Sequence, residues 1–366
     1  MKIAFFNVTA SFIPGGLETY CWEAGRALAR RGHEVTIVAG DRGKAWHSEV
    51  RLVQFPFRSE KEWPDFGVRF RRLAERASFA SHGALEHLLD AGYDAIIVNK
   101  PFDFPILWRA RRAGLKATTL FRSGGTDFFP TDRWFAGSID RWVSASRYNA
   151  KQVGSRYGRS VEVVHNGVDI DAFSPVHASS NMRARYATPN QPVVVSVGRL
   201  VGWKGIHVVI NAIASLPSLV YLVVGTGPEE GALKMLAAKL GVSGRVIFAG
   251  RVAHEELPKL LAQCDIFVQP SIGEEAFGIS VVEAMASGVP VIASDNGGLP
   301  EIVVNGATGL LLPPGDTAAW QREIAGLIDE PRRARHIGEA ARERAVAHFT
   351  WSANAARHEA LLFGDR

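Results

Sequence analysis

Hydrophobic residues occur in short runs along the chain, and these runs alternate with segments in which apolar positions recur at helical spacing. The first half has strand-like runs at residues 2–8, 35–39, 95–99 and 116–121. It has one clear helix, at 17–31. The alternation restarts in the second half, with strand-like runs at 192–197, 219–224, 246–249, 266–269 and 289–293 and helices at 206–215, 230–240 and 254–263. Apolar strands that alternate with helices favour a parallel sheet covered on both faces. Two such series predict two doubly wound α/β domains, with ligands near the carboxyl ends of the strands.

The polar, proline-containing stretch 174–191 separates the two series and has no strong apolar period. We therefore predict an N-terminal domain at 1–173 and a C-terminal domain at 174–349. A chain of 366 residues is long enough for each domain to bury its own core. Thr350 is a good N-cap residue, and the apolar stripe behind it predicts a last helix at 350–366.

The segment E-E-A-F-G-I-S-V-V-E at 274–283 has the pattern of a loop that leads into a helix. Glu275 is expected at the mouth of this helix, and Glu283 more than one turn inside it. The free N–H groups of a helix N-terminus suit a phosphate. A carboxylate on either side can accept hydrogen bonds from the hydroxyls of a ribose and a hexose. The segment therefore indicates a ligand with phosphates in its middle and a sugar at each end.

The pair Glu275-x7-Glu283, with Phe277-Gly278 between them, resembles the signature of the retaining glycosyltransferases of family 4, which have the GT-B fold. Four other segments match that family in order along nearly the whole chain: P-G-G-L-E at 14–18, H-N-G-V-D at 165–169, G-R-L-V-G-W-K-G at 198–205 and G-V-P-V-I-A-S at 288–294. The resemblance implies two Rossmann-like domains that face a central cleft. It also implies that the N-terminal domain binds the acceptor, the C-terminal domain binds the donor, and the last helix packs back on the N-terminal domain.

Arg199 and Lys204 follow a predicted strand on a glycine-containing loop and precede a helix. Two cations at a helix start can hold a diphosphate. The resemblance implies that they bind the donor diphosphate and stabilise the leaving nucleotide, so that Arg199, Lys204 and Glu275 carry the catalysis. It also implies that Glu275 holds the donor sugar and Glu283 the ribose. The remaining donor-binding positions that it implies are Gly15, Gly16, Arg251, Val252, Phe277, Gly278 and Ile279.

The segment F-R-S-G-G-T-D-F-F at 121–129 follows a predicted strand and should border the ligand. Members of the family often carry a histidine here that contacts the 6-hydroxyl of the sugar or supports catalysis, but alignment on Thr126-Asp127 places Gly124 at that position. Three explanations stay open: a neighbouring side chain substitutes for the histidine, the donor is a 6-deoxyhexose such as rhamnose, or the two glycines form a variant turn. The residues expected near the acceptor or the sugar are Arg122, Ser123, Gly124, Asp127 and Asn166.

The composition is that of an ordinary soluble globular protein, with 47% hydrophobic and 22% charged residues. No stretch approaches the roughly 18 apolar residues of a membrane span, and the N-terminus has no signal-peptide pattern. The two cysteines, Cys21 and Cys264, are far apart and are expected as buried free thiols. We therefore expect a cytoplasmic protein. The eleven histidines show no paired metal-ligand spacing, so we expect no metal and no cofactor.

The net charge of +5 resides in the first half of the chain. Residues 1–182 contain 25 Lys and Arg against 19 Asp and Glu, whereas the remainder contains 17 against 18. The basic clusters are Arg69, Arg71, Arg72 and Arg76, and Arg109, Arg111 and Arg112. An apolar stripe, formed by Phe66, Phe70, Leu73 and Ala77 behind Trp63, lies beside the first cluster. No nucleic-acid motif accompanies these charges, so the expected partner is an anionic membrane surface, bound peripherally. The alternative is an ordinary surface helix docked on the core.

The sequence thus predicts a retaining glycosyltransferase that moves a hexose or 6-deoxyhexose from a GDP- or UDP-linked sugar to a glycan or lipid-linked acceptor. Bacterial lipopolysaccharide, O-antigen or exopolysaccharide synthesis at the inner face of the cytoplasmic membrane is the expected setting. Within this class, the alternative is transfer to a soluble acceptor. Two other classes share the fold: nucleotide-sugar epimerases, which the Glu275-x7-Glu283 pattern argues against, and non-catalytic nucleotide-sugar-binding partners, which the intact Arg199 and Lys204 argue against.

Overall fold

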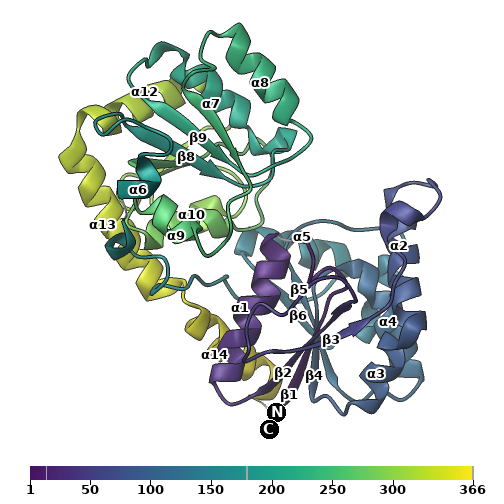
Figure 1. The fold of residues 1–366 in the computed structure, drawn as a ribbon. Coiled ribbons are helices and arrows are strands. Elements are labelled where there is room, and N and C mark those ends of the chain that lie inside the picture. The colour runs from purple at the N-terminus through teal and green to yellow at the C-terminus, as the bar shows by residue number, and fades with distance from the viewer. Residues whose placement is uncertain (14, 179, 365–366) are drawn as a thin grey trace. The chain divides into compact units, whose positions relative to one another are not determined.

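The computed structural model describes residues 1–13, 15–178 and 180–364, which form two compact units (Figure 1). The N-terminal unit comprises Met1–Gly167 together with Trp351–Arg366, and the C-terminal unit comprises Val168–Thr350. The last helix therefore belongs to the N-terminal unit, although it follows the whole C-terminal unit in the sequence.

The N-terminal unit is built on a seven-stranded parallel sheet with strand order β3-β2-β1-β4-β5-β6-β7. Its strands are β1 (Lys2–Phe6), β2 (Glu34–Gly40), β3 (Arg51–Phe55), β4 (Ala95–Val98), β5 (Thr118–Ser123), β6 (Arg141–Ser144) and β7 (Glu162–Val163). Its α-helices are α1 (Gly16–Arg30), α2 (Val68–Phe79), α3 (Leu85–Asp90), α4 (Phe104–Arg112), α5 (Arg147–Tyr157) and α14 (Trp351–Phe363). Short 3₁₀ or π turns are η1 (Glu60–Glu62), η2 (Ala80–Ala84), η3 (Pro101–Asp103) and η4 (Asp132–Ser138).

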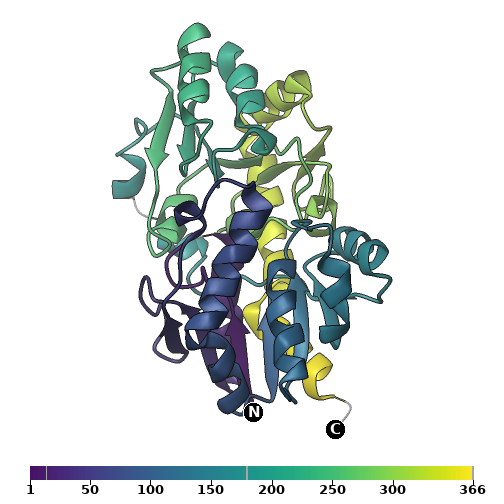
Figure 2. The ribbon, with the colours of Figure 1, turned by 90° about the vertical axis from the view of Figure 1, so that its right-hand side faces the viewer.

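Helices cover both faces of this sheet, which is why its strands are apolar throughout. Along β1, Ile3 and Phe5 belong to the hydrophobic cluster under α1 and α14, whereas Ala4 and Phe6 belong to the cluster under α2, α3 and α4. Successive side chains of a strand point to opposite faces, so this one strand supplies both cores. Figure 2 shows α2 and α4 in front of the sheet and α14 behind it.

The C-terminal unit has a six-stranded parallel sheet with strand order β10-β9-β8-β11-β12-β13. Its strands are β8 (Val193–Val197), β9 (Val220–Val224), β10 (Val246–Gly250), β11 (Ile266–Gln269), β12 (Val291–Ser294) and β13 (Leu310–Leu312). Its α-helices are α6 (Ser180–Arg183), α7 (Ile206–Ala212), α8 (Glu230–Lys239), α9 (Leu257–Leu261), α10 (Ile279–Ala286), α11 (Leu299–Ile302), α12 (Thr317–Asp329) and α13 (Pro331–His348). Short 3₁₀ turns are η5 (Pro175–His177), η6 (Gly202–Lys204) and η7 (Ile213–Ser215).

The two units meet in the sequence at Gly167 and Val168, six residues before the boundary that we placed after residue 173. Val168 forms an isolated β-bridge with Thr350, and Arg342 on α13 donates a hydrogen bond of 3.0 Å to the carbonyl oxygen of Phe173. These contacts attach the segment 168–173 to the C-terminal unit. The polar stretch that we read as a linker lies inside that unit.

Most predicted strands and helices occur close to their predicted positions. The exceptions have local causes. The helix predicted at 254–263 is the shorter α9, which begins at Leu257 and has Pro258 in its first turn, where the missing N–H of proline does no harm. Four strands were not predicted. β6, β7 and β13 have only four, two and three residues, and β3 is a partly exposed edge strand.

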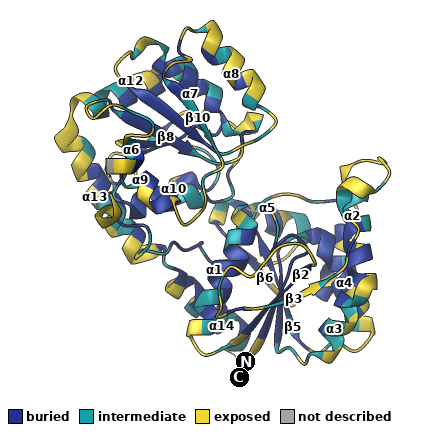
Figure 3. Cartoon of the chain, in the orientation of Figure 1, coloured by how far each residue is buried: buried dark blue, intermediate teal, exposed yellow. Residues whose placement is uncertain are grey.

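The basic helix that we considered for membrane binding is α2, and its two ends differ. Phe66, two residues before the helix, and Phe70, in its first turn, are 75% and 42% exposed, and Figure 3 shows the exposed first turn. Further along, Arg76 is buried and pairs with Glu75, and its Nε lies 3.4 Å from Asp103. Apart from the exposed Ala77, the second half of α2 is thus tied to the core, and its start is exposed. Within the described residues, no helix is long and apolar enough to cross a membrane.

Candidate active site

In the C-terminal unit, the loops that follow β8, β9 and β11 pack backbone against backbone. A Cβ atom on Gly205 would lie 1.9 Å from the carbonyl oxygen of Pro270, and one on Gly225 would lie 1.9 Å from that of Gly198. Any side chain at these two glycines would force the loops apart. The glycines of this region therefore fix the position of Lys204, which ends η6 directly before Gly205.

Lys204 and Glu275 form an ion pair at this edge of the sheet. Oε1 of Glu275 also accepts hydrogen bonds from Gln269 Nε2 at 2.8 Å and from Ser271 Oγ at 2.9 Å. Glu275 is only 7% exposed, and Lys204 Nζ lies 4.8 Å from the ring centroid of Trp203. Three donors on one oxygen fix the orientation of this carboxylate. Gln269 and Ser271 were not predicted as site residues, although their place at the carboxyl end of β11 is a signal that could have found them.

The helix α10 begins just after this ion pair. Its N-cap is Gly278, whose φ of 113° lies in the region that favours glycine, and no side chain caps the first N–H groups. Phe277 is buried, with its ring 5.9 Å from that of Phe349, so the backbone before the helix is anchored. The N–H groups at Ile279 and beyond can therefore bind an anion beside Lys204.

Glu283 lies inside α10 and is 6% exposed. Its Oε1 lies 3.2 Å from Nε2 of His254, in the loop after β10. His254 is a candidate site residue that the sequence analysis missed, because it assigned this position to a helix. Its only local signal is its place just after Arg251 and Val252, in a loop that follows a strand.

The two other predicted cations of this unit have a different environment. Arg199 and Arg251 are exposed, and neither guanidinium forms a hydrogen bond or an ion pair with another described residue. Val252, beside Arg251, is half-buried. Both arginines can therefore turn toward a ligand without breaking an existing contact, whereas Lys204 must share its charge with Glu275.

In the N-terminal unit, Gly15 is the N-cap of α1 and Gly16 its first residue. Gly15 has an extended backbone with φ of −175°, which any residue can adopt. A glycine is needed here only because a side chain would have no room. A Cβ at Gly15 would lie 2.7 Å from Oε2 of Glu18, whose Oε1 accepts a hydrogen bond of 2.6 Å from Thr9 Oγ1. Pro14, the first residue of the P-G-G-L-E segment, lies outside the described residues.

Arg122, near the end of β5, is 1% exposed and lies beneath α1. It donates a hydrogen bond to Oδ1 of Asn166, and its guanidinium carbon lies 4.0 Å from the ring centroid of Tyr20. The structure thus brings together Arg122 and Asn166, two residues that we expected near the acceptor or the sugar.

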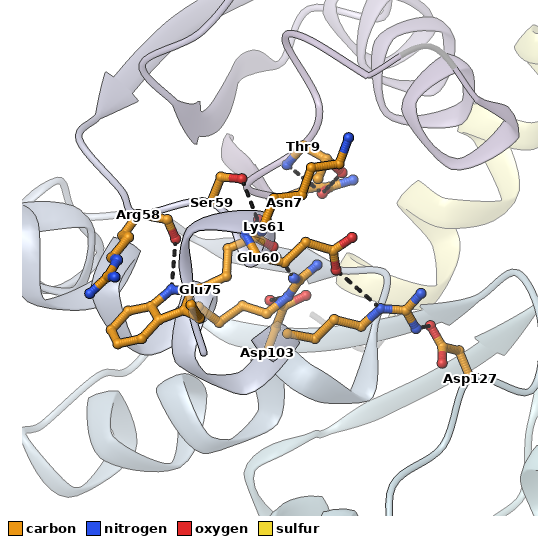
Figure 4. Close-up of polar contacts among 12 residues, drawn as sticks. Asn7, Thr9, Arg58, Ser59, Glu60, Lys61, Glu75, Asp103 and Asp127 are labelled. Atoms are coloured by element: carbon orange, nitrogen blue, oxygen red, sulfur yellow. Dashed lines mark hydrogen bonds and ion pairs between the residues drawn. The ribbon is translucent and has the colours of Figure 1, made fainter. Parts of the chain in front are cut away.

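The other candidates near Gly124 point elsewhere. Ser123 donates a hydrogen bond of 2.8 Å to the carbonyl oxygen of Gly125, within its own loop. Asp127 forms an ion pair with Arg72 of α2, which also approaches Glu60 at 3.6 Å (Figure 4). Asp127 therefore ties the loop after β5 to α2 and away from Arg122.

Buried hydrogen bonds connect this edge to the last helix. The hydroxyl of Tyr20 lies 2.8 Å from Nε2 of His358, and Nδ1 of His358 lies 3.0 Å from the carbonyl oxygen of Asn354. Burial lowers the pKa of His358 to about 4, so the ring is neutral at pH 7, and its Nδ1–H donates to that carbonyl. Asn354 in turn donates to the carbonyl oxygen of His165 at 2.7 Å.

The part of the chain that the structure describes contains no group of three or more His, Cys, Asp or Glu side chains that could hold a metal ion. Both cysteines are buried free thiols, and burial raises the pKa of Cys21 to about 12.

Two family models divide the chain between them. The model described as Glycosyltransferase Family 4 matches residues 14–172, and the model described as Glycosyl transferases group 1 matches residues 179–344. A GDP-mannose-dependent alpha-(1-6)-phosphatidylinositol monomannoside mannosyltransferase of Mycolicibacterium smegmatis is 32% identical, and the match covers 98% of each chain. The chain belongs to the family 4 glycosyltransferases.

Two other proteins extend the comparison of this family 4 glycosyltransferase. A D-inositol 3-phosphate glycosyltransferase of Nocardia farcinica is 35% identical over 60% of this chain and 52% of its own. The structure of a sucrose-phosphate synthase from Thermosynechococcus elongatus superposes with a TM-score of 0.84 at 25% identity and covers 100% of both chains.

The family and the GT-B fold class that the sequence predicted are confirmed. The roles of the individual residues stay predictions. In this family 4 glycosyltransferase, all the donor-side residues except Gly15 and Gly16 lie in the C-terminal unit, whereas the acceptor-side residues Arg122, Gly124 and Asn166 lie in the N-terminal unit.

Proposed function

We propose that this glycosyltransferase moves mannose or a related hexose from a GDP-linked sugar to a lipid-linked glycan acceptor, with retention of the anomeric configuration. The observation that carries the proposal is the cluster of Lys204, Glu275 and the uncapped start of α10, which offers a cation, a hydroxyl acceptor and free N–H groups side by side. The relative that is similar over nearly its whole length uses GDP-mannose, which supports the choice of nucleotide and sugar.

The chemistry follows from these groups. Bond cleavage releases a nucleoside diphosphate and leaves positive charge on the sugar. Lys204, Arg199 and the N–H groups of α10 stabilise the negative charge that develops on the leaving phosphate, and this electrostatic contribution is expected to dominate. Glu275 accepts hydrogen bonds from sugar hydroxyls through the oxygen that its three protein donors leave free. An oxygen of the leaving phosphate takes the proton of the acceptor hydroxyl, which attacks from the same face.

A divalent ion is not required by this arrangement. Lys204 and Arg199 supply two positive charges, and α10 adds the partial charge of its N-terminus. Because Lys204 shares its charge with Glu275, these groups offset part of the charge of a diphosphate, and Arg199 can turn toward it without breaking a contact. We therefore propose a metal-independent transferase without a cofactor.

We further propose that the acceptor is lipid-linked and that the start of α2 touches the membrane that carries it. Phe66 and Phe70 are exposed aromatic rings in edge contact at 5.3 Å, and the exposed Arg69 lies between them in sequence. Apolar rings beside a cation suit an anionic bilayer surface. We therefore propose that the enzyme takes part in bacterial lipid-linked glycan synthesis at the inner face of the cytoplasmic membrane.

A soluble acceptor is the second candidate. It is favoured by the inositol 3-phosphate transferase, which is similar over more than half of this chain. The two acceptor classes differ in whether activity depends on a membrane surface.

The test begins with thermal unfolding in EDTA, alone and with GDP, UDP, ADP or dTDP, followed by the same series with Mg²⁺. GDP is expected to raise the unfolding temperature most, because a ligand that binds only the native state stabilises it. Turnover is then measured as GDP release from GDP-mannose with a lipid extract or a soluble inositol phosphate as acceptor. Stabilisation by UDP alone would contradict the proposal that the nucleotide of the donor is GDP. No stabilisation by any of the four nucleotides would contradict the donor site.

A further inference from the structure

Arg122 is a buried cation with few partners. It is 1% exposed, and one of its five N–H groups donates to Asn166. Its Nε has no hydrogen-bond partner, and the guanidinium forms no ion pair with any described carboxylate. Burial lowers its pKa. The ring of Tyr20, 4.0 Å from the guanidinium carbon, is its other neighbour, and neither partner carries a negative charge. A buried charge without a counter-ion is unfavourable, which is consistent with a partner that the protein alone does not provide.

The guanidinium lies directly behind the glycine where other family members often carry a histidine. A Cβ atom at Gly124 would lie 2.9 Å from Nη1 of Arg122 and 2.5 Å from Cδ2 of Leu17, the second residue of α1. Gly124 therefore cannot carry a side chain unless Arg122 or Leu17 moves. The guanidinium of Arg122 thus occupies part of the space that a side chain at position 124 would need.

The loop in front of this guanidinium is thin. Gly124 and Gly125 are both half-buried, and a Cβ at Gly125 would meet no atom within 4 Å. Gly124 thus lies against Nη1 of Arg122, and its neighbour Gly125 has open space beside it. A charged ligand atom that settles over them would come close to the guanidinium without entering the core.

The start of α1 adds a second attractive element. It is a helix of 15 residues whose N-cap, Gly15, makes no side-chain capping hydrogen bond. Glu18, in the first turn of α1, has its carboxylate beside Gly15 and accepts a hydrogen bond from Thr9. Glu18 would repel an anion at the Gly15 side, so the favourable approach is along Leu17 and Gly124, where Arg122 lies.

We propose that Arg122 is the anion-recognition residue of the N-terminal unit and that it binds a phosphate oxygen of a substrate across Gly124, together with the start of α1. A guanidinium with an unpartnered N–H is suited to phosphate, because its donors form a fixed fork. The two phosphate sources are the diphosphate of the donor and a phosphate of the acceptor. Phosphate binding by Arg122 does not depend on the proposed function; only the choice between the donor and the acceptor phosphate rests on it.

The decisive variant is Arg122→Met, which keeps the length of the side chain and removes the charge. Replacing a poorly partnered buried charge with an apolar side chain is expected to leave the unfolding temperature unchanged or to raise it. Binding of the phosphate ligand should weaken by about tenfold, the effect of losing one charged hydrogen bond. Arg30→Met, which removes an exposed charge from the far end of α1, is the matched control and should change neither property.

Two probes separate the sources, each titrated by calorimetry against both variants and the parent protein. GDP reports the donor diphosphate, and myo-inositol 1-phosphate reports an acceptor phosphate. Weaker binding of GDP assigns Arg122 to the donor, and weaker binding of the inositol phosphate assigns it to the acceptor. Unchanged affinity for both probes, or a parent protein that binds neither, overturns the inference. If GDP-mannose supports no turnover but Arg122→Met still weakens either probe, the proposed function fails and this inference stands.

Gly124→Ala provides an independent check if Arg122→Met does not fold. Its Cβ would press on both Leu17 Cδ2 and the guanidinium of Arg122 while every core residue is kept, so it should weaken the same probe as Arg122→Met. Gly137→Ala is its control, because a Cβ at Gly137 would meet no atom within 4 Å. Equal affinity of the two alanine variants for that probe would contradict the inference.

Discussion

The carboxyl edges of the two sheets hold their charges in opposite ways. In the C-terminal unit, Lys204 is paired with Glu275 on loops that touch through glycines, so the charges are compensated and partly accessible. In the N-terminal unit, Arg122 lies in the core with an amide and an aromatic ring as partners. Two sheets of the same doubly wound type thus offer a preformed ion pair on one side and a cation that lacks an anion on the other. We expect removal of the paired cation, Lys204, to slow the transfer reaction. We expect removal of the unpaired cation, Arg122, to weaken phosphate binding without loss of stability.

The largest effect is expected from Lys204→Ala. It removes the cation that we propose to face the leaving diphosphate and leaves the carboxylate of Glu275 buried without its counter-ion. We expect kcat to fall by about 10²–10³, the usual loss for one preorganised charge at a developing anion. GDP release from GDP-mannose measures it. Lys234→Ala, which breaks an exposed pair with Glu230 on α8, should stay within about twofold of the parent. A kcat equal to that of the control would remove Lys204 from the mechanism.

The next effect tests whether loop contact or backbone conformation fixes the C-terminal site. Gly205 and Gly241 have nearly the same φ, 66° and 69°, but only at Gly205 would a Cβ atom meet a neighbouring backbone oxygen, at 1.9 Å. Gly241→Ala should cost about 1 kcal/mol of stability from φ alone. Gly205→Ala should cost about 3 kcal/mol, because the loops must also separate. Urea unfolding measures both, and equal losses would show that the loop contact is unimportant.

Acid should weaken the N-terminal unit through His358. In the unfolded chain its pKa is near 6.5, whereas burial lowers it to about 4 in the folded protein. The unfolded chain therefore binds the proton first, and stability is lost as the pH falls from about 6.5 toward 4. Between pH 7 and pH 5 the expected loss is roughly 2 kcal/mol.

The measurement is urea unfolding at the two pH values for the parent and for His358→Gln. The variant should lose this part of the pH dependence, whereas His336→Gln, at an exposed position of α13, should keep it. An unchanged slope in His358→Gln would contradict the assignment.

A smaller effect is expected from Glu283→Gln. It retains the shape of the side chain, but weakens the hydrogen-bond acceptor that we propose for the ribose hydroxyls. GDP should bind about tenfold less tightly, because a hydrogen bond to a charged group is replaced by a neutral one. Titration calorimetry with GDP measures this change. Glu230→Gln, on the surface helix α8, is the control, and equal affinity in the two variants would place the ribose elsewhere.

The smallest effect concerns the membrane. Phe66→Ser should weaken the free energy of binding to vesicles of phosphatidylglycerol and phosphatidylcholine by about 1 kcal/mol. The effect is small because only the part of the ring that enters the bilayer surface contributes. Sedimentation with vesicles at low and high salt measures binding. Met235→Ser, a similarly exposed apolar residue on α8 of the other unit, should leave it unchanged. Binding that neither Phe66→Ser nor high salt reduces would contradict a role for α2.

Local sequence was sufficient for much of this description. The period of the apolar residues predicted two α/β units, and the ordered motifs predicted the family. The sequence also placed Arg199 and Lys204 on a glycine-containing loop between a strand and a helix. These features depend on residues within a few positions of one another. The boundary was placed six residues late because the contacts that decide it join Phe173 to Arg342 and Val168 to Thr350.

The sequence by itself determined the fold class, the family and the positions of Lys204, Glu275 and Glu283. Only the tertiary structure decided their partners. His254 reaches Glu283 across 29 residues, Arg122 reaches Asn166 across 44, and Tyr20 reaches His358 across 338. Periodicity reports which face of an element is apolar, but it carries no information about which distant polar group meets another. That depends on strand order, because neighbouring parallel strands bring the ends of remote segments to one edge.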